Sequence, residues 1–403
     1  MGKSTHLIGQ PIYLQIIKLL DRSKISQITR QGGYDRYTKQ FDSYTHLITY
    51  LYAVLSKYDS IREIIAGLLS NATKLGHLGI KYCVRRSTFA YANNNRSSKF
   101  FGKVYQSLYQ QYASFLLDSR DNKKRRLYIM DSTTISLFSN ILKGAGRNPI
   151  KGKKKGGIKV HTIIASDENV PHFIRFTSAA TNDHVLLKDV DIPEGSFIVF
   201  DRGYVNYRAY EQFTQQNITY VTKLKKNTVF EGIEEIDIPD DSDTGIIKDE
   251  IIVLRKNATK ELPLLEHKCR RIAYWDDEKG KLIEFLSNNT ELTAEEVIEI
   301  YKRRWQIETL FKQLKQNFQL RYFYGDSVNA IESQIWVVMI ANLLLSVIQK
   351  KVKQSWSFSN LATIVRIILM NYYDLYSFLE KPEQDWKNIF EIEPPPKMAS
   401  LFD

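Results

Sequence analysis

Two aspartates in predicted β-strands are the residues whose chemistry can be inferred most directly. Asp131 lies in the run Leu-Tyr-Ile-Met-Asp-Ser-Thr-Thr-Ile that begins at Leu127, where alternate residues share one face of a strand. Asp201 ends a second run, Phe-Ile-Val-Phe-Asp, and Gly203 after it permits a sharp turn. A carboxylate in an apolar strand is costly unless something neutralises it. Two on one sheet can converge on Mg²⁺, which prefers oxygen ligands, although each alone could be a turn cap or half of a salt bridge.

A predicted helix supplies a third carboxylate. The capping-box pattern Thr-Ala-Glu-Glu at Thr293 opens a helix that is predicted to run to about Phe318. At about 100° per residue, a polar set falls within roughly one quadrant of this helix, namely Tyr301, Arg304, Glu308, Lys312 and Lys315. A single acid among cations and a phenol is suited to bind a metal ion beside phosphate groups. The alternative interpretation is that these side chains form an ordinary charged face exposed to solvent. For Trp305, next to Arg304, core packing is favoured over stacking on a nucleic-acid base.

The elements that must position these acids form a mixed α/β layer. Short β-branched runs predict five strands, at residues 127–137, 157–165, 170–177, 196–200 and 218–223. Helices are predicted at 183–190 and 206–216, between the later strands, and Asp183 is most simply an N-cap. The order is therefore hairpins first and helical crossovers later, which is typical of a mixed sheet.

The spacing of the helix residues resembles the YREK signature of the insertion-sequence-four family of bacterial DDE transposases. The four signature positions all match, at Tyr301, Arg304, Glu308 and Lys315. Asp131-Ser-Thr-Thr and Asp201-Arg-Gly-Tyr resemble the first and second catalytic blocks of that family, and the likeness covers roughly residues 125–320. More weakly, the segment that begins at Arg86 is similar to the DNA-binding region of the family.

The resemblance implies a fold, a reaction and a cofactor. The fold would be a ribonuclease-H-like core interrupted by a β-rich insertion. Asp131, Asp201 and Glu308 would be catalytic and would hold two Mg²⁺ ions, for which Mn²⁺ would substitute. Family members cut double-stranded DNA at the terminal inverted repeats of a transposon and join the free 3′ ends to a target, and synapsis of two ends implies a homodimer. Contacts to DNA phosphate are expected from Tyr301, Arg304, Lys315, Arg202, Lys312, Lys153, Lys154 and Lys155.

Five segments follow from these patterns. Residues 1–120 form a helical DNA-binding domain, 121–226 the first part of the catalytic core, 227–286 the β-rich insertion, 287–350 the remainder of the core, and 351–403 a helical tail. Within the first segment, two short helices and a basic, Asn-rich stretch could form a helix-turn-helix reader or a plain helical bundle.

Composition limits the class of protein. The chain has 403 residues, of which 43% are hydrophobic, and this excludes a disordered or collagen-like chain. Two cysteines, Cys83 and Cys269, exclude a disulfide framework and a cysteine-rich zinc site. The apolar run 335–348 is shorter than the roughly 18 residues of a membrane span, so a buried helix is predicted and no membrane partner is expected. A cytoplasmic, nucleoid-associated location fits.

The charge distribution indicates nucleic acid. The formal net charge is +12. Seven cations and no acid lie in residues 143–159, whereas residues 231–250 hold nine acids and one lysine. A basic track around one group of acids is what a DNA-processing enzyme requires. The alternatives are a DNA-binding remnant without catalysis and a ribonuclease-H-like nuclease with a structure-specific substrate.

Overall fold

The computed structural model describes residues 10–117, 126–136, 157–168, 170–179, 181, 183–238, 245–256 and 264–384. Of the basic stretch 143–159, residues 143–156 lie outside the described residues, and these include Lys153, Lys154 and Lys155. The chain divides into two compact units. Unit 1 combines Met1–Leu116 with Gln313–Asp403, and unit 2 is Leu117–Lys312.

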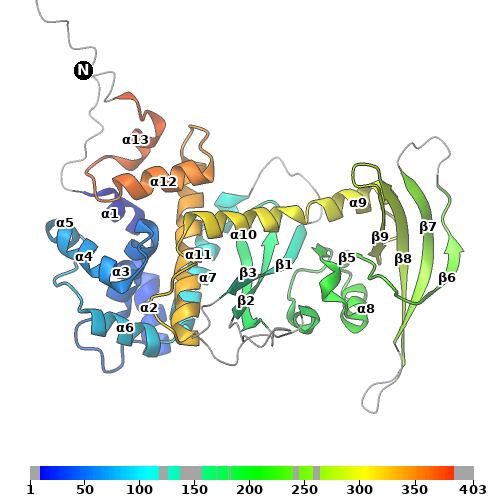
Figure 1. Cartoon of the computed structure of the whole chain (residues 1–403), viewed down its shortest axis with the longest axis horizontal. Helices are drawn as coiled ribbons and strands as arrows, with labels where there is room; N and C mark the ends of the chain where they lie inside the picture. The colour runs from blue at the N-terminus through cyan, green and yellow to red at the C-terminus, as the bar shows by residue number, and fades with distance from the viewer. Residues whose placement is uncertain are drawn as a thin grey trace, which may run out of the picture. The chain divides into compact units, whose positions relative to one another are not determined.

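Unit 2 is built on one mixed sheet of nine strands, in the order β3-β2-β1-β4-β5-β9-β8-β7-β6 (Figure 1). The strands are β1 (Leu127–Ser136), β2 (Gly157–Ala165), β3 (Pro171–Ser178), β4 (Phe197–Phe200), β5 (Thr219–Lys223), β6 (Phe230–Glu235), β7 (Ile246–Lys256), β8 (Leu265–Asp276) and β9 (Lys281–Ser287). The strands β1, β4 and β5 are parallel, and every other pairing is antiparallel. The five strands predicted for the core all form, with ends within one residue of the prediction.

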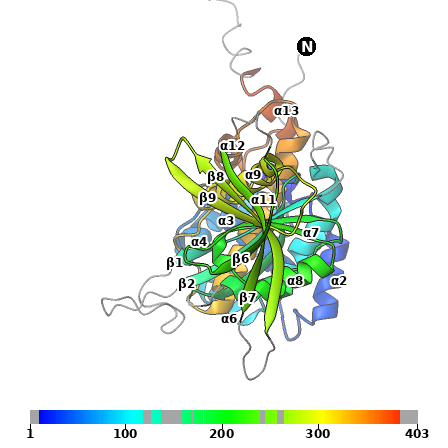
Figure 2. The same ribbon diagram turned by 90° about the vertical axis from the view of Figure 1, so that its right-hand side faces the viewer.

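The insertion β6–β9 continues the same sheet beyond β5, and Figure 2 shows the strong twist of its strands. Strand-like runs in the sequence predict three of its strands, at residues 246–254, 269–275 and 281–286. The fourth, β6, was missed because its residues are almost all exposed and show no alternation of polar and apolar side chains. It is held by its backbone pairing with β7 at the sheet edge.

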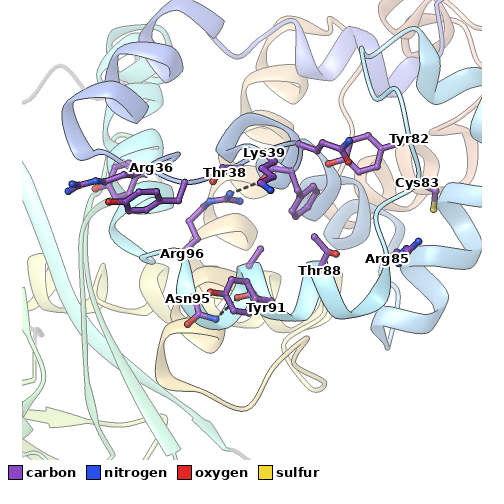
Figure 3. A pocket seen from close by; sticks show the side chains of 15 residues that line it. Arg36, Thr38, Lys39, Tyr82, Cys83, Arg85, Thr88, Tyr91, Asn95 and Arg96 are labelled. Atoms are coloured by element: carbon purple, nitrogen blue, oxygen red, sulfur yellow. Dashed lines mark hydrogen bonds between the residues drawn. The ribbon is translucent and has the colours of Figure 1, made fainter.

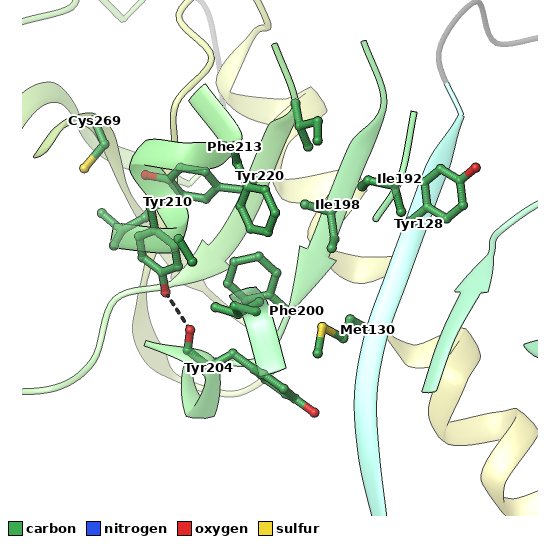
Figure 4. Close-up of a cluster of buried hydrophobic side chains, with 14 of the residues drawn as sticks. Tyr128, Met130, Ile192, Ile198, Phe200, Tyr204, Tyr210, Phe213, Tyr220 and Cys269 are labelled. Carbon is green, nitrogen blue, oxygen red and sulfur yellow. Dashed lines mark hydrogen bonds between the residues drawn. The ribbon is translucent and has the colours of Figure 1, made fainter. Parts of the chain in front are cut away.

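Short helices connect the strands of unit 2, namely η1 (Asp183–Asp189), η2 (Arg202–Tyr204), α8 (Tyr207–Gln215) and α9 (Ala294–Lys302), and α10 (Trp305–Asn317) begins in this unit. The core under α8 is rich in aromatic rings, as Figure 4 shows. Met130 of β1 and Phe200 of β4 face this cluster and are opposite each other in the register. Because side chains alternate along a strand, Asp131 must point to the other face of the sheet.

The prediction of one continuous helix from Thr293 to Phe318 is wrong. The capping box at Thr293 forms, but α9 ends at Lys302 and α10 begins at Trp305. Between them the backbone hydrogen bonds change to the tighter i→i−3 pattern, with the Arg304 N–H donating to the Tyr301 carbonyl at 3.0 Å. No glycine or proline marks this break, so the pattern of residue types could not reveal it.

Unit 1 is helical, and its helices are α1 (Ile12–Ile17), α2 (Arg22–Gly32), α3 (Ser43–Ser56), α4 (Ile61–Ser70), α5 (Ala72–Gly76), α6 (Arg86–Asn95), α7 (Lys99–Leu116), α11 (Val328–Lys351), α12 (Phe358–Ile368) and α13 (Leu375–Glu380). The run Ser-Ile-Arg-Glu at Ser60 is a capping-box pattern, which predicts that a helix begins there. The α4 helix does begin there, and the Ser60 hydroxyl accepts from the Glu63 N–H. A helix-turn-helix needs a turn of about 3–4 residues, whereas residues 77–85 separate α5 from α6. These two helices therefore do not form a helix-turn-helix.

The α11 helix lies at the centre of unit 1, against α3, α7 and α12. By length and composition alone it could cross a membrane, because the helix extends beyond the apolar run 335–348. In the structure, however, 83% of its most apolar stretch is buried inside the protein. The prediction of a buried core helix is confirmed.

Candidate active site

The sheet brings Asp131 and Asp201 to neighbouring positions. Met130 on β1 pairs with Phe200 on β4 in parallel register, so the aspartates that follow them occupy equivalent places on adjacent strands. The Asp131 side chain is 19% exposed, and its Oδ1 accepts from the Ser132 N–H at 2.7 Å. Asp201 comes directly after β4 and caps η2 through the Gly203 N–H at 3.4 Å.

Arg304 joins the first aspartate to the helix carboxylate. Its Nη1 donates to Asp131 Oδ2 at 3.0 Å, and its Nη2 donates to Glu308 Oε1. The guanidinium side chain is 14% exposed, and its Nε is buried without a hydrogen-bond partner among the described residues. The helix break places Arg304 at this point, since it lies in the turn between α9 and α10.

Tyr301 contacts the second aspartate. Its hydroxyl donates to Asp201 Oδ1 at 3.3 Å, and the Lys223 ammonium lies 4.5 Å from the centre of its ring. Burial raises the pKa of Tyr301 above its ordinary value, with the charge of Asp201 adding to the shift and Arg304 opposing it. The phenol therefore stays protonated and acts as a hydrogen-bond donor.

The carboxylates interact electrostatically. The pKa of Asp131 is raised to about 6, mainly by burial. The negative charges of Asp201 and Glu308 add to this shift, and the Ser132 N–H and Arg304 oppose it. The pKa of Asp131 is thus higher than that of an ordinary aspartate because the site gathers negative charge where water is scarce. A divalent cation would relieve that repulsion.

The donor chemistry of the site fits a hard divalent cation, because its acids offer only oxygen ligands. Among the described residues, no group of three His, Cys, Asp or Glu side chains is close enough to hold one ion. The physical reason is that Arg304 lies between Asp131 and Glu308 and supplies the positive charge there. In this structure the Arg304 guanidinium is the cation between these two acids, and its Nε is buried without a hydrogen-bond partner among the described residues.

Asp183, which was predicted to be a helix N-cap, is the first residue of η1 and lies beside the candidate acids. Its Oδ1 accepts from Lys159 Nζ at 2.9 Å and from Ser132 Oγ at 3.2 Å. A methyl group added at Gly203 would lie 3.7 Å from Asp183 Oδ2 and 3.8 Å from Asp201 Oδ2, so the two carboxylates face the same point. The Asp183 carboxylate is thus held by a lysine that lies 24 residues earlier in the chain.

Two lysines that no sequence motif predicted lie next to Asp201. A hollow of about 560 Å³ is lined by Asp201, Arg202, Gly203, Val205, Lys225 and Lys226. Arg202 was predicted to contact DNA, whereas the two lysines were not. The signal that could have found them is the Lys-Lys pair two residues after the end of β5.

Two of the remaining predicted phosphate contacts are lysines on α10. Lys312 and Lys315 are both exposed on α10, but the boundary between the units falls between them. Lys315 lies about two turns beyond Glu308 on the same helix. Lys153, Lys154 and Lys155 lie outside the described residues.

The prediction that Trp305 packs in the core is wrong. Its side chain is 65% exposed, while Ile307 in the same turn is fully buried. Trp305 is the first residue of α10, and the break before it shifts the face that a continuous helix would bury. A large exposed aromatic ring therefore stands immediately beside Arg304.

Residues 122–344 match the family described as "Transposase DDE domain", and this is more than half of the chain. The protein therefore belongs to the transposase DDE domain family. Residues 8–81 match a second family, described as "Domain of unknown function (DUF4372)".

Among curated proteins, the chain is 28% identical over 262 residues to "Putative transposase y4zB" of Sinorhizobium fredii, covering 64% of this chain and 70% of that protein. It is 21% identical over 349 residues to "Probable transposase for insertion sequence element IS5377" of Geobacillus stearothermophilus, covering 85% and 86%. A solved structure of the piggyBac transposase synaptic complex with hairpin DNA has a TM-score of 0.44 and 12% identity, covering 99% of this chain and 88% of that chain. That structural similarity is below the level that establishes a common fold.

Proposed function

We propose that this chain is a DNA transposase of the insertion-sequence-four family, which cuts at the terminal inverted repeats of its element and joins the free 3′ ends to target DNA. Membership of the transposase DDE domain family and the names of the curated relatives support the general function. The spacing of Tyr301, Arg304, Glu308 and Lys315 supports the narrower family. A DNA-binding remnant and a structure-specific nuclease are not favoured, because the relatives are transposases and all three acids are present.

The observation that carries the proposal is the arrangement of acids around one Arg–Tyr pair. Asp131 and Glu308 both accept from Arg304, and Asp201 accepts from Tyr301. Phosphodiester cleavage at a metal centre requires such a group of acids beside phosphate-binding cations. The strand order β3-β2-β1-β4-β5, with β1, β4 and β5 parallel, supports a ribonuclease-H-like core that the insertion β6–β9 interrupts.

In this proposal Asp131, Asp201 and Glu308 would hold two Mg²⁺ ions, with Mn²⁺ able to substitute. When bound, the ions would activate the attacking oxygen and stabilise the leaving oxygen of an in-line displacement. Arg304 would bind phosphate oxygens through the planar fork whose Nη atoms now contact Asp131 and Glu308, when metal ions neutralise those two acids. Tyr301, protonated because its pKa is raised, can donate to a carboxylate or to a phosphate.

Positive charge around the acids would hold the DNA. Arg202, Lys225 and Lys226 line the hollow next to Asp201 and are suited to phosphate groups. Lys312 and Lys315 on α10 and the lysines Lys153, Lys154 and Lys155 complete the proposed set. Synapsis of two transposon ends would require a homodimer, and the protein would act in the cytoplasm at the nucleoid.

Substitution of the three acids tests this function. We expect Asp131→Asn, Asp201→Asn and Glu308→Gln each to reduce Mg²⁺-dependent cleavage and joining by at least about a hundredfold, because each removes a charge from the reacting centre. The substrate is a duplex taken from the DNA that flanks the gene, and the products are resolved on a denaturing gel.

Glu299→Gln is the matched control. Glu299 is on α9, is 66% exposed and pairs only with Lys302 among the ion pairs of the described residues. Its loss should change the rate less than about twofold. Wild-type cleavage by any one of the three acid variants would refute the assignment of that acid.

A further inference from the structure

Unit 1 contains a hollow of about 850 Å³ far along the chain from the candidate acids. It lies between the loop that includes residues 36–41 and the helix α6, as Figure 3 shows. The loop side belongs to the region that matches a domain of unknown function. The side chains that line the hollow therefore indicate what kind of ligand this region binds.

The lining of the hollow is basic. Arg36, Lys39 and Arg85 are exposed at its walls, and none of them is in an ion pair among the described residues. No acidic side chain lines the hollow in the described part of the chain. Three cations without counter-charges around one concave surface favour an anionic ligand.

Two tyrosines leave their rings open at the same hollow. Tyr37 is 90% exposed and Tyr91, on α6, is 70% exposed, although both line the hollow. Tyr37 also has a φ of 65°, a left-handed conformation that is unfavourable for a residue with a bulky side chain. The Arg36 guanidinium lies 5.2 Å from the centre of the Tyr37 ring. Exposed aromatic rings beside cations are the elements of a stacking platform for nucleic-acid bases.

The floor of the hollow is held in place by Arg96. This arginine follows α6 and donates to the Phe41 carbonyl at 2.7 Å and to the Asp42 carbonyl at 3.4 Å, and it lies 3.8 Å from the Asp35 carboxylate. These contacts tie the loop to the end of the helix. The two tyrosines are thus presented from two elements whose separation is set before any ligand binds.

We propose that this hollow binds unstacked nucleotides of single-stranded DNA, with base faces on Tyr37 and Tyr91 and phosphates on Arg36, Lys39 and Arg85. The ligand class rests on the proposed function in DNA transposition. A duplex keeps its bases stacked on one another and offers no free base faces to a tyrosine ring. Cations alone would suffice to bind its phosphates, so the two exposed rings favour a single strand. The volume is in the range of about 300–1,000 Å³ that holds a small ligand, which is enough for one or two nucleotides.

Binding of single strands by the full-length protein tests this proposal. The probe is a fluorescein-labelled oligothymidylate of about ten nucleotides, followed by fluorescence anisotropy in EDTA so that no cleavage occurs. We expect Tyr37→Ala and Tyr91→Ala each to raise the Kd by about tenfold, which is the scale of one lost base–aromatic stack. Tyr37→Phe and Tyr91→Phe, which keep the ring, should bind nearly as the wild type does.

A duplex of the same length separates stacking from charge. Its Kd should change less than about twofold in the two tyrosine-to-alanine variants. Lys39→Ala should reduce the magnitude of the slope of log K against log salt for the single strand by about 0.7. Matched controls are Ile367→Ala, at a side chain that is 70% exposed, and Lys103→Ala, at an exposed lysine on α7, and both should leave the Kd unchanged.

Two outcomes would overturn the proposal: wild-type single-strand affinity in both alanine variants, or equal losses for single strand and duplex. Should an alanine variant fail to melt as the wild type does, the charge reversal Lys39→Glu replaces it, and its unchanged affinity would equally overturn the proposal. Glu308→Gln should bind the oligothymidylate normally in EDTA. If the wild-type protein shows no Mg²⁺-dependent cleavage while the tyrosine-to-alanine variants bind single strands weakly, the proposed function is wrong and the hollow stands. If the wild type cleaves and the tyrosine-to-alanine variants bind normally, the hollow is wrong and the function stands.

Discussion

At the scale of residues, Arg304 organises the candidate site more than any of the acids does. It contacts two of the three carboxylates, and it stands in the turn that separates α9 from α10. The residue types of the site and their order were predictable, since each acid sits in a recognisable run. The pairing of Arg304 with Asp131 was not predictable, because it joins residues on separate elements far apart in the chain.

Trp305, next to Arg304, carries the residue-scale prediction. Because its ring is 65% exposed, Trp305→Ala should leave the melting temperature unchanged while reducing cleavage of the DNA end by about tenfold, through loss of one base stack. Trp305→Phe should retain most of the activity. The measurement is the initial rate of cleavage in Mg²⁺. Val229→Ala, at a side chain that is 88% exposed in the same unit, is the control, and equal rates for Trp305→Ala and wild type would show that the ring contacts no DNA.

At the scale of elements, the insertion neutralises much of its own charge. The nine acids of residues 231–250 predict a strongly negative segment in an otherwise basic chain. Two of these acids, however, pair with arginines on β8. Asp249 on β7 pairs with Arg270, and Glu250 pairs with Arg271. Arg270 also donates to the Leu292 carbonyl, which lies just before α9. The sheet pairing of β7 with β8 decides this neutralisation, and composition alone could not indicate it.

The Asp249–Arg270 pair makes a prediction about stability. Both side chains are 4% exposed, so Arg270→Met would leave a buried carboxylate without its partner. We expect a loss of about 3–5 kcal/mol in the free energy of unfolding, measured in urea. The double variant Asp249→Leu with Arg270→Met should recover most of that loss, because no unpaired charge remains. A single variant as stable as the wild type would mean that the pair is open to water in solution.

At the scale of the whole molecule, unit 1 is assembled from both ends of the chain. A buried polar network lies where these two segments meet. Asn93 Nδ2 donates to the Tyr324 carbonyl at 2.9 Å, and Asn93 Oδ1 lies 2.7 Å from His46 Nε2. Because that oxygen can only accept, Nε2 carries the proton of a neutral imidazole. The other nitrogen, Nδ1, is buried without a partner in the described structure.

His46 makes the fold sensitive to acid. Burial, with a further contribution from Arg96, lowers the pKa of His46 to about 3. Between the unfolded pKa of about 6.5 and that value, the unfolded chain binds a proton that the folded protein excludes. Stability should therefore fall by up to about 1.4 kcal/mol for each pH unit below 6.5. Urea unfolding at pH 7, 6 and 5 should show a shallower pH dependence for His46→Gln than for the wild type, and parallel curves would exclude the mechanism.

The sequence by itself determined the local features of this protein: the core strands, the helix caps at Ser60 and Thr293, and the two aspartates and one glutamate in their order. These follow from periodicity and capping, which act over a few residues. Only the tertiary structure decided the break before Trp305, its exposure, the partners of Arg304 and Asp183, and the joining of both chain ends in unit 1. Each of these depends on contacts between residues far apart in the chain, and local residue patterns carry no information about such contacts.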